Sequence, residues 1–483
     1  MLALVVLLAV GCGGAKTSTT SSVPASAKQA PADALAFVSL NTDLSSDQWT
    51  NAQALVDLFP SMKATLTKSI DSALAAQKLD WKTDVEPALG PELVVVVTAD
   101  SKPVILLQPA DEAKLDHLLS LDTGTKPVKG KVGDWTALAQ TQADIDAYSA
   151  ALGRGTLDTV DTFSTAVAGL PADTLVTAWV DGAGLTENIG KVASAASSLG
   201  SGTSVPGLGL ATGKDGKIDL GLDSIAMALS AKANGLFVAV DARGAKLGNG
   251  THYKTVLFKK VPGDAVAALS FGGTQKTLDS LRGPLDKLSG TLESTLGVSL
   301  DRITSALSGE GVIYVRRGSG TVPEVTAVLS PPDANETLTT IDTLMHKLAA
   351  QTGSKIQQVT MDDVSVSRLE LNGVPLSYGK LDADTVIVTT GSDAIASFNG
   401  SSERLADSDA FKRAATEVQL GDETTGFVYV DLDGLIPLIT GLTGPNAIPA
   451  DARAALEKLD SFILQSTADG DGTHVSGFVA VNK

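Results

Sequence analysis

The chain has 483 residues, of which 43% are hydrophobic and 19% are charged, and its formal net charge is −18. This apolar content excludes a wholly disordered chain, and the length suits two or three domains, because one core usually stops growing near ~250–300 residues. The acidic excess argues against a surface that follows nucleic-acid phosphates, so we expect no nucleic-acid partner. With one cysteine, the chain can form neither an intrachain disulfide nor a cysteine-rich zinc site.

The first eleven residues have the features of a lipoprotein signal peptide. Residues 2–10 are an uncharged apolar run, too short to span a membrane, which takes ~20 residues, but of the length of a signal-peptide hydrophobic region. The stretch from Ala9 to Cys12 resembles the bacterial lipobox, although Ala9 stands where leucine is commonest. Because no Lys or Arg precedes the run, we expect the natural start to lie a few codons upstream.

Cys12 is the predicted lipid attachment site. Its thiol would form a thioether to diacylglycerol, and two acyl chains hold a protein on a bilayer where one holds it only marginally. The alternative is an unmodified cysteine beside a short signal sequence. Residues 12–30 are mostly small and polar, which predicts a flexible tether. The protein would then be anchored to the cell membrane on its extracytoplasmic side.

An internal repeat organises the remaining sequence. Pro31–Val38 recurs as Pro262–Leu269, and Ala88–Glu92 recurs as Ala306–Glu310. Three further segments recur in the same order: Gln108–Asp111 with Pro331–Asp333, Val180–Leu185 with Val430–Leu435, and Asp223-Ser224 with Asp460-Ser461. We therefore predict two related domains, at residues 31–250 and 251–483, divided at the turn-rich segment 243–250.

Each half begins with a strand and a long helical segment. Leucines and other apolar residues recur at helical spacing over residues 55–74 and again over 278–296. Pro60 and Pro284 should each break or restart the helix. The second segment has near-heptad spacing, but it is too short for a coiled coil, so we expect it to pack against its own sheet.

Strands follow these helices. Leu93–Val97 is apolar on both faces, which predicts a central strand that is covered on both sides. Val104–Leu107 follows after a short connection and should be its antiparallel neighbour. In the second half, Val364–Leu371 alternates and runs into Asn372-Gly373, which predicts an extra hairpin. The first half is longer around residues 200–216. The predicted fold class is α+β, with two duplicated domains, each a largely antiparallel sheet packed with helices.

Two motifs carry a family resemblance. The opening Pro31–Ala36 before a strand, and Asp84–Gly90 before a buried strand, resemble a bacterial family of secreted and lipid-anchored proteins that is catalogued only as a domain of unknown function. The likeness covers most of residues 31–483. It implies an extracytoplasmic protein and brings no catalytic or ligand residues.

The acidic motifs are best explained as turns and caps. The repeated Pro-x-Asp before a strand is typical of a turn, and Asp181 and Asp431 stand where an N-cap is expected. Residues 431–434, Asp-Leu-Asp-Gly, lack the further carboxylates of a calcium-binding EF-hand loop. Asp469–Gly472 should be a hairpin turn, with calcium binding there the less favoured alternative.

No catalytic template fits the other candidate residues. The four histidines, His117, His252, His346 and His474, have no partners at metal-ligand spacing. Neither Gly-x-Ser-x-Gly nor His-Glu-x-x-His occurs. Gly207–Asp215 fails as a phosphate loop, because Leu208 and Asp215 replace required residues. All four tryptophans lie in the first half, at positions 49, 81, 135 and 179, where core packing is favoured over an aromatic-lined site. We predict no catalytic, cofactor or metal residues.

The sequence thus predicts a non-enzymatic, lipid-anchored envelope protein that binds an unknown envelope protein or braces an assembly. One alternative is a carrier of a lipid or another apolar ligand in an internal cavity. The other is an envelope hydrolase with a dispersed acid/base pair, which would need two facing carboxylates in a cleft, or a hydroxyl beside a histidine.

Overall fold

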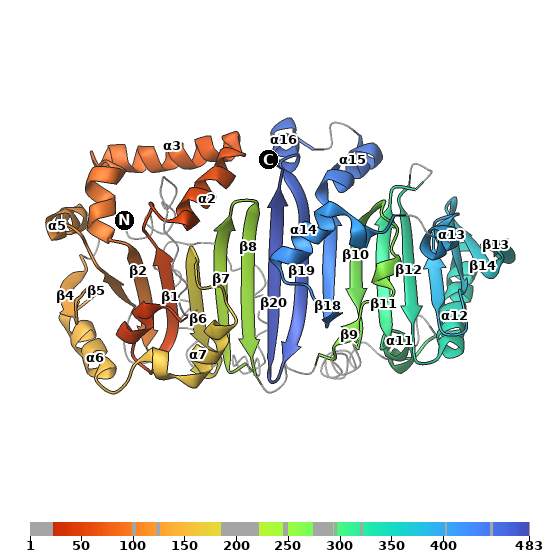
Figure 1. The fold of residues 1–483 in the computed structure, drawn as a ribbon, viewed down its shortest axis with the longest axis horizontal. Coiled ribbons are helices and arrows are strands. Elements are labelled where there is room, and N and C mark those ends of the chain that lie inside the picture. The colour runs from red at the N-terminus through yellow and green to blue at the C-terminus, as the bar shows by residue number, and fades with distance from the viewer. Residues whose placement is uncertain are drawn as a thin grey trace. The chain divides into compact units, whose positions relative to one another are not determined.

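The computed structural model describes residues 23–98, 103–121, 126–184, 222–244, 250–273, 293, 297–318, 322–400, 403–444 and 448–482. The chain divides into two compact units between residues 247 and 248, close to the turn-rich segment 243–250. We call them unit 1 and unit 2 (Figure 1). In both units, every described strand pairing is antiparallel. The α+β fold class with largely antiparallel sheets is confirmed.

Unit 1 places its first strand in the middle of its sheet. Its strands are β1 (Ala34–Asn41), β2 (Glu92–Thr98), β3 (Val104–Leu107), β4 (Val128–Val132), β5 (Trp135–Ala139), β6 (Val176–Asp181), β7 (Ser224–Lys232) and β8 (Gly235–Arg243). They lie in the order β4-β5-β3-β2-β1-β6-β7-β8. The central position of β2 and its antiparallel pairing with β3 confirm the two strand predictions.

Helices pack on both faces of the strands of unit 1. They are η1 (Ala25–Gln29), α2 (Asp47–Asp57), α3 (Pro60–Ala76), η2 (Trp81–Val85), α4 (Glu86–Leu89), α5 (Glu112–Ser120), α6 (Gln142–Leu152), η3 (Leu157–Thr159) and α7 (Asp161–Ala168). On one face, Phe163 of α7 packs edge-to-face against Phe37 and Trp179. On the other face, η2, α4 and α5 bury Val95 and Ile105 in a common cluster.

The helical segment at residues 55–74 is interrupted as predicted. Helix α2 ends at Asp57 and α3 begins at Pro60, where proline is tolerated because the first turn needs no N–H donor. The matching segment 278–296, with Pro284, lies outside the described residues except for Glu293.

The end of the predicted tether belongs to the folded unit. Residues 25–29 form the 3₁₀ helix η1, and Ala27 and Ala30 are fully buried. The Ser26 hydroxyl donates to Glu92 Oε1 (2.5 Å), and Tyr148 Oη donates to the Gln29 carbonyl (2.6 Å). The prediction that residues 12–30 form one flexible tether is therefore wrong for 25–30. Their small side chains pack closely against the unit, which composition alone could not reveal.

Unit 2 repeats this strand order and adds a hairpin. Its strands are β9 (Tyr253–Lys254), β10 (Ala265–Phe271), β11 (Glu310–Arg316), β12 (Glu324–Ser330), β13 (Ile356–Met361), β14 (Val364–Leu371), β15 (Val374–Lys380), β16 (Val386–Thr389), β17 (Glu423–Thr424), β18 (Gly426–Asp431), β19 (Leu459–Asp469) and β20 (Gly472–Val481). The order is β13-β14-β15-β16-β12-β11-β10-β18-β19-β20, and β9 pairs with β17.

The predicted extra hairpin is confirmed. Strands β14 and β15 are joined by Asn372 (φ 52°) and Gly373 (φ 83°), the left-handed pair that a two-residue hairpin turn requires. Strand β13 pairs with the other edge of β14. Unit 2 therefore has two strands, β13 and β14, beyond the position that β4 occupies in unit 1.

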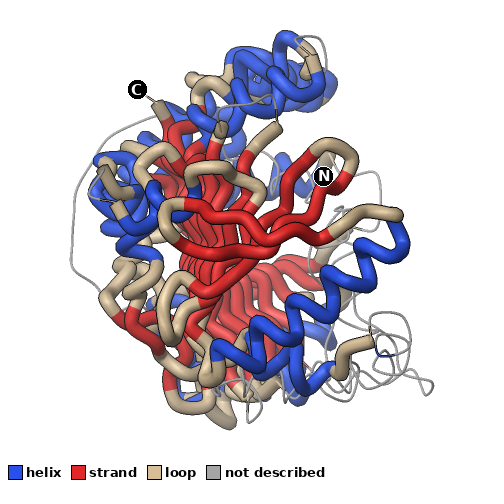
Figure 2. Tube along the Cα trace, turned by 90° about the vertical axis from the view of Figure 1, so that its right-hand side faces the viewer, coloured by secondary structure: helices blue, strands red, loops and turns tan. Residues whose placement is uncertain are grey.

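The helices of unit 2 also lie on both faces of its strands. They are η4 (Phe258–Lys260), α11 (Leu300–Ala306), α12 (Ala334–Thr352), α13 (Ala394–Asn399), η5 (Leu405–Asp407), α14 (Asp409–Glu417), α15 (Leu432–Thr443) and α16 (Ala450–Leu456). Phe411 of α14 packs against Phe427 and Tyr429. On the other face, α12 buries Tyr378 and Val386. Figure 2 shows this long helix lying along the strands at the near end.

Among the described residues, no helix combines the length and the apolarity that a membrane crossing would need.

Candidate functional site

The predicted lipid attachment site, Cys12, lies outside the described residues, as do the signal peptide and the first part of the tether. The Gly-rich segments 200–216 and 207–215 lie outside them too.

The two Pro-x-Asp motifs lie in turns and Asp431 lies at a helix cap, as predicted. The Asp431 side chain caps α15 by accepting from Gly434 N (3.0 Å). Burial raises the pKa of that carboxyl, while the Gly434 amide opposes the shift. Residues 469–472 turn between β19 and β20, with Gly470 at φ 57°.

The histidines are dispersed over both units. His117 lies on α5, which begins after the N-cap Asp111, and His346 lies on α12, which begins after the N-cap Asp333. His252 Nε2 contacts the Ala468 carbonyl (2.8 Å), and His346 Nδ1 lies 3.3 Å from Asp342 Oδ2. Within the described ranges, no three His, Cys, Asp or Glu side chains are placed to share a metal ion.

The tryptophans pack in the core of unit 1, as predicted. Trp49, Trp135 and Trp179 are buried. Trp49 Nε1 donates to the Asn41 carbonyl (2.8 Å), which satisfies the indole donor inside the fold. Trp81 is partly buried and packs against two core clusters. These side chains stabilise the unit and do not line a common site.

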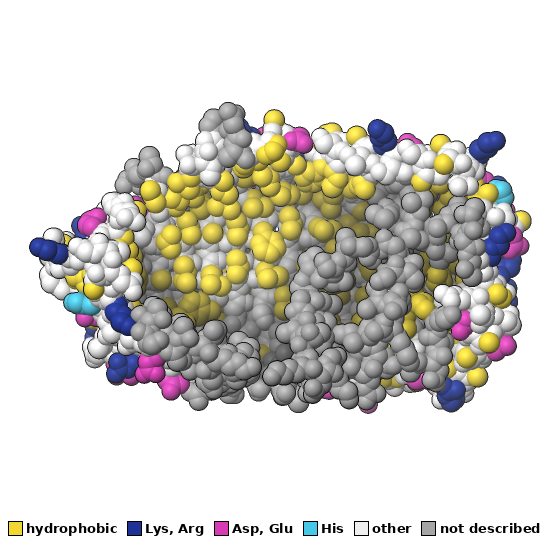
Figure 3. Space-filling view, turned by 180° about the vertical axis from the view of Figure 1, so that it is seen from behind, with side chains coloured by type: hydrophobic (Ala, Val, Ile, Leu, Met, Phe, Trp, Pro, Cys, Tyr) yellow, Lys and Arg dark blue, Asp and Glu magenta, His cyan; other side chains and the backbone are white. Residues whose placement is uncertain are grey.

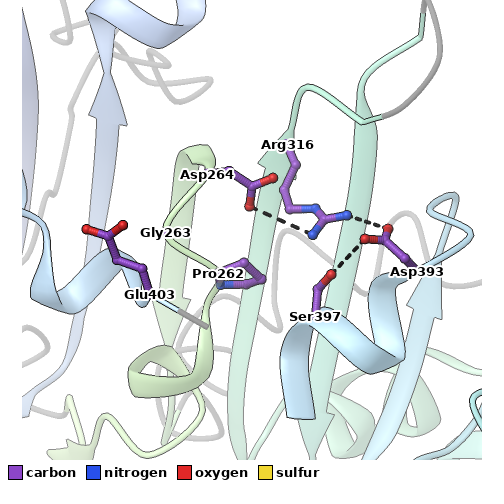
Figure 4. A pocket seen from close by; sticks show the side chains of 7 residues that line it. All are labelled: Pro262, Gly263, Asp264, Arg316, Asp393, Ser397 and Glu403. Atoms are coloured by element: carbon purple, nitrogen blue, oxygen red, sulfur yellow. Dashed lines mark hydrogen bonds and ion pairs between the residues drawn. The ribbon is translucent and has the colours of Figure 1, made fainter. Parts of the chain in front are cut away.

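A pocket of about 340 Å³ in unit 2 gathers carboxylates around Arg316 (Figure 4). The Arg316 side chain is 6% exposed and donates to Glu324 Oε2 (2.8 Å) and Asp393 Oδ1 (2.5 Å), with Asp264 at 3.7 Å. Glu403 also lines the pocket. The cluster ties the ends of β11 and β12 to the start of α13.

The chemistry of this pocket is that of a structural ion cluster. Although burial raises the pKa of Asp393, the Ser397 hydroxyl and the Arg316 guanidinium hold it below its ordinary value. A general acid needs the opposite shift, toward neutral pH. Asp393 stays ionised and, together with Glu324, compensates the charge of the buried arginine.

A larger feature of unit 2 is a sheet face that is apolar and only partly covered. We call it the open face and define it by three positions on each of six adjacent strands. They are Val325, Ala327 and Leu329 (β12); Gly311, Ile313 and Val315 (β11); Ala267, Leu269 and Phe271 (β10); Gly426, Val428 and Val430 (β18); Phe462, Leu464 and Ser466 (β19); and Val475, Gly477 and Val479 (β20). Figure 3 shows apolar side chains, in yellow, gathered over the strands.

The two faces of these strands differ in burial. On the helix-covered side, alternating residues such as Val312, Tyr314 and Phe427 are buried. On the open face, most residues are half-buried, and Val325, Leu269 and Leu464 are 42%, 38% and 36% exposed. Large apolar residues in adjacent exposed rows are unusual on a protein surface, which makes the open face a candidate binding surface.

The open face is also smooth. Phe271 lies over Gly311, since a Cβ at Gly311 would come within 2.3 Å of its ring. Gly426, directly opposite Phe271 on the next strand, and Gly477 add no side chain. From the spacing of residues and strands, the face measures about 14 Å along the strands and about 24 Å across them.

The sequence did not reveal this face. Strands that are apolar on both sides indicate a central strand covered on both sides, and this holds for β2 of unit 1. In unit 2 the same pattern occurs where one side is partly exposed. No local sequence signal distinguishes a strand covered on both faces from a strand with one face partly exposed, because the covering helices are distant in the sequence.

The comparisons with known proteins assign a family and no activity. The family model described as "Protein of unknown function (DUF3352)" matches residues 1–109 and 211–480, and the chain belongs to this family. This confirms the resemblance to a domain of unknown function. No curated protein matches the chain.

The solved structures that match are crystal forms of one protein, TP0453. Form III is 13% identical and has a TM-score of 0.25, covering 46% of this chain and 93% of that chain. Form IV is 11% identical and has a TM-score of 0.26, covering 48% and 95%. TM-scores of this size do not establish a shared fold.

Proposed function

We propose that this member of the DUF3352 family is a lipid-anchored protein of the bacterial cell envelope that binds lipid acyl chains on the open face of unit 2. The partly exposed apolar rows of that face carry the proposal. The role is binding or carriage of an apolar ligand, without catalysis. The ligand would lie on an open surface, whereas the carrier that the sequence offered as an alternative would hold it in an internal cavity.

The composition of the open face favours an apolar occupant. Every residue on it except Ser466 is apolar or glycine, so a polar ligand would lose its hydration without gaining partners. Its inner strands are hydrogen-bonded on both sides, so an added peptide strand finds no free backbone groups there.

The size of the face favours acyl chains. One leaflet contributes about 15 Å of hydrocarbon, half of the ~30 Å bilayer core. A chain of that length fits across the strands, where the face measures about 24 Å. Each buried CH₂ contributes about 0.8 kcal/mol, so a chain lying across the face gains enough to offset the ordering of its own bonds.

The proposed lipid anchor is consistent with the same ligand. Cys12 follows a lipobox-like sequence, and the folded part begins close behind it, with η1 at Ala25. A protein anchored through Cys12 would stay beside a bilayer, where acyl chains are the most abundant apolar molecules.

We also infer that the two units are copies of one ancestral domain. Their strands have the same order around β1 and β10. A Cβ at Gly184 would meet Asp181 Oδ2 at 2.5 Å, and a Cβ at Gly434 would meet Asp431 Oδ2 at the same distance. The same close approach of aspartate and glycine after a central strand supports common descent.

Titration of the purified full-length chain with a fluorescent fatty acid tests the ligand. We expect saturable binding that the double variant Leu269→Lys/Leu464→Lys weakens about tenfold or more, because each lysine places a charge within the apolar rows. Leu442→Lys on α15 is the matched control, since Leu442 is also exposed (49%) but lies outside the open face. It should bind like the parent.

Two results would contradict the acyl-chain proposal. One is the absence of saturable binding by the parent chain. The other is a stable dimer in sedimentation that the double variant converts to monomer, because a second copy would then cover the face.

Mass analysis of the mature amino terminus tests the anchor independently. We expect Cys12 as the first residue, carrying diacylglycerol and further palmitate-type acylation, and accumulation of the precursor when globomycin blocks the lipoprotein signal peptidase. An unmodified mature protein released into the medium would exclude the anchor.

A further inference from the structure

A second pocket of unit 2, of about 480 Å³, lies between α12 and the strands β13, β14 and β15. Its floor is formed by the sheet and one wall by the helix. Seven of the residues that line it have polar side chains: Thr339, Asp342, Gln358, Ser365, Ser367, Tyr378 and Lys380. The volume is that of a small-molecule site.

The polar groups of this pocket are held in place by one another. Tyr378 Oη donates to Asp342 Oδ1 (2.8 Å), and Gln358 Nε2 donates to Ser367 Oγ (2.8 Å). Burial raises the pKa of Tyr378 to about 12, and the bond to Asp342 acts in the same direction, so the phenol stays a donor. A carboxylate accepts up to about four hydrogen bonds. Asp342 therefore remains able to accept from a ligand.

Charge and polarity narrow the class of ligand. Asp342 is an anion, and Lys380, which donates to Asn335 Oδ1 (3.0 Å), is a cation on the same pocket. A phosphate or carboxylate ligand would be repelled by the Asp342 carboxylate, and an amine ligand would be repelled by the Lys380 ammonium group. Hydroxyl, amide, carboxylate and ammonium groups together suit a neutral ligand with several hydroxyls, which both donate and accept.

Unit 1 has ion pairs at the equivalent position. Strand β4 occupies the place of β15 beside the neighbouring strand, and its Lys129 and Lys131 pair with Glu112 and Asp116 of α5. In unit 2, Tyr378 and Lys380 occupy these places. The added strands β13 and β14 supply Gln358 and Ser367. Unit 2 therefore has a polar pocket where unit 1 has ion pairs between β4 and α5.

We propose that the pocket between α12 and β13–β15 binds a neutral saccharide. Asp342 and Gln358 provide acceptors and a donor for its hydroxyls, and Lys380 provides further donors. This inference is independent of acyl-chain binding on the open face.

Isothermal titration and saturation-transfer NMR on the full-length chain test the site with glucose, N-acetylglucosamine and maltose as probes. We expect saturable binding that Asp342→Asn and Ser367→Ala each weaken, Asp342→Asn by about tenfold, because a hydrogen bond to a charged group is lost. Asn can still accept from Tyr378, and an unchanged melting temperature verifies the fold. Asp116→Asn, the carboxylate of α5 in unit 1, is the matched control and should leave binding unchanged.

The saccharide could be a soluble glycan or the headgroup of a glycolipid. Vesicles that carry a glycosyl diacylglycerol distinguish these two sources. Binding of free sugars that Asp342→Asn weakens supports the site and indicates a soluble glycan or oligosaccharide. Binding only to the vesicles, weakened by the same variant, supports the site and indicates a lipid headgroup. No saturable binding in either arm, or binding that neither pocket variant changes, would overturn the proposal. Fatty-acid binding to the open face has a separate readout and should persist in Asp342→Asn.

Discussion

Units 1 and 2 share a strand order but cover their sheet faces to different extents. In unit 1, η2, α4 and α5 bury the face over β2, β3 and β5, and exposed apolar residues remain at Met227 and Leu236 on β7 and β8. In unit 2, α12 covers β15 and β16, and exposed rows extend from β12 to β19. The same strand order can therefore leave very different amounts of an apolar sheet face exposed to solvent.

A shared feature shows which contacts both units retain. The first residue of β2, Glu92, accepts from the hydroxyls of Ser26 and Ser39 (2.5 Å each), and the first residue of β11, Glu310, accepts from Leu257 N (2.6 Å). Both carboxylates hold the segment that precedes the first central strand. The partners differ, hydroxyls in one unit and backbone amides in the other, while the position is kept.

The largest expected effect separates the two faces of unit 2. Phe427→Ala should lower the free energy of unfolding by about 4 kcal/mol, because Phe427 is buried against Phe258 and Phe411 and its loss leaves a cavity. Leu464→Ala, on the open face, should cost about 1 kcal/mol or less. Urea unfolding measures both. Equal losses would mean that the open face is packed as tightly as the covered one.

Arg316 distinguishes unit 2 from unit 1, where Thr98 takes the same place in the strand register. Arg316→Met should destabilise unit 2 by about 3 kcal/mol, because it leaves Glu324 buried without its cation. The control Thr98→Val should change stability by about 1 kcal/mol or less. A restored stability in Arg316→Met/Glu324→Leu would verify the cause, whereas a neutral single variant would contradict it.

Glu310 should make the stability of unit 2 depend on pH. Burial raises the pKa of its carboxyl to about 7, although the amides of Leu257, Phe258 and Val256 oppose the shift. The folded protein then holds a proton that the unfolded chain releases near pH 4.5. The stabilisation that this raised pKa gives to the folded protein is fully present below pH 4.5 and is lost as the pH rises through about 7.

Comparison with Glu310→Gln isolates this contribution, because Gln does not titrate and its oxygen can still accept from Leu257. The difference in unfolding free energy, parent minus variant, should fall between about pH 4.5 and 7 and stay constant above. A difference that stays constant over the whole range would remove this role of Glu310.

The smallest expected effect concerns the hairpin that has no counterpart among the described strands of unit 1. Asn372→Ala should cost about 1 kcal/mol, because Asn372 has φ 52° and alanine tolerates the left-handed conformation less well. Asn335→Ala, at an exposed helix position near the pocket, controls for loss of an asparagine. Thermal melts measure both, and equal shifts would show that the turn conformation contributes nothing.

Local sequence features were predictable because their causes are local. The Asn-Gly turn, the break before Pro60 and the cap at Asp431 each follow from the backbone preferences of one to four residues. The predicted tether failed at residues 25–30, because its small side chains do not reveal that Ala27 and Ala30 pack against the unit. The composition of a segment shows how much apolar surface it could bury, but it does not show whether another part of the fold packs against it.

The candidate sites were less predictable. Val312 and Ile313 are neighbours in one apolar strand, yet one is buried and the other half-exposed. The polar pocket joins Asp342 to Tyr378, which lie on different elements and carry no motif. The sequence by itself determined the α+β class, the antiparallel strands and the turns, because alternation and turn chemistry act over a few residues. Only the tertiary structure decided which apolar face stays open and which polar groups meet, because both depend on where distant helices pack.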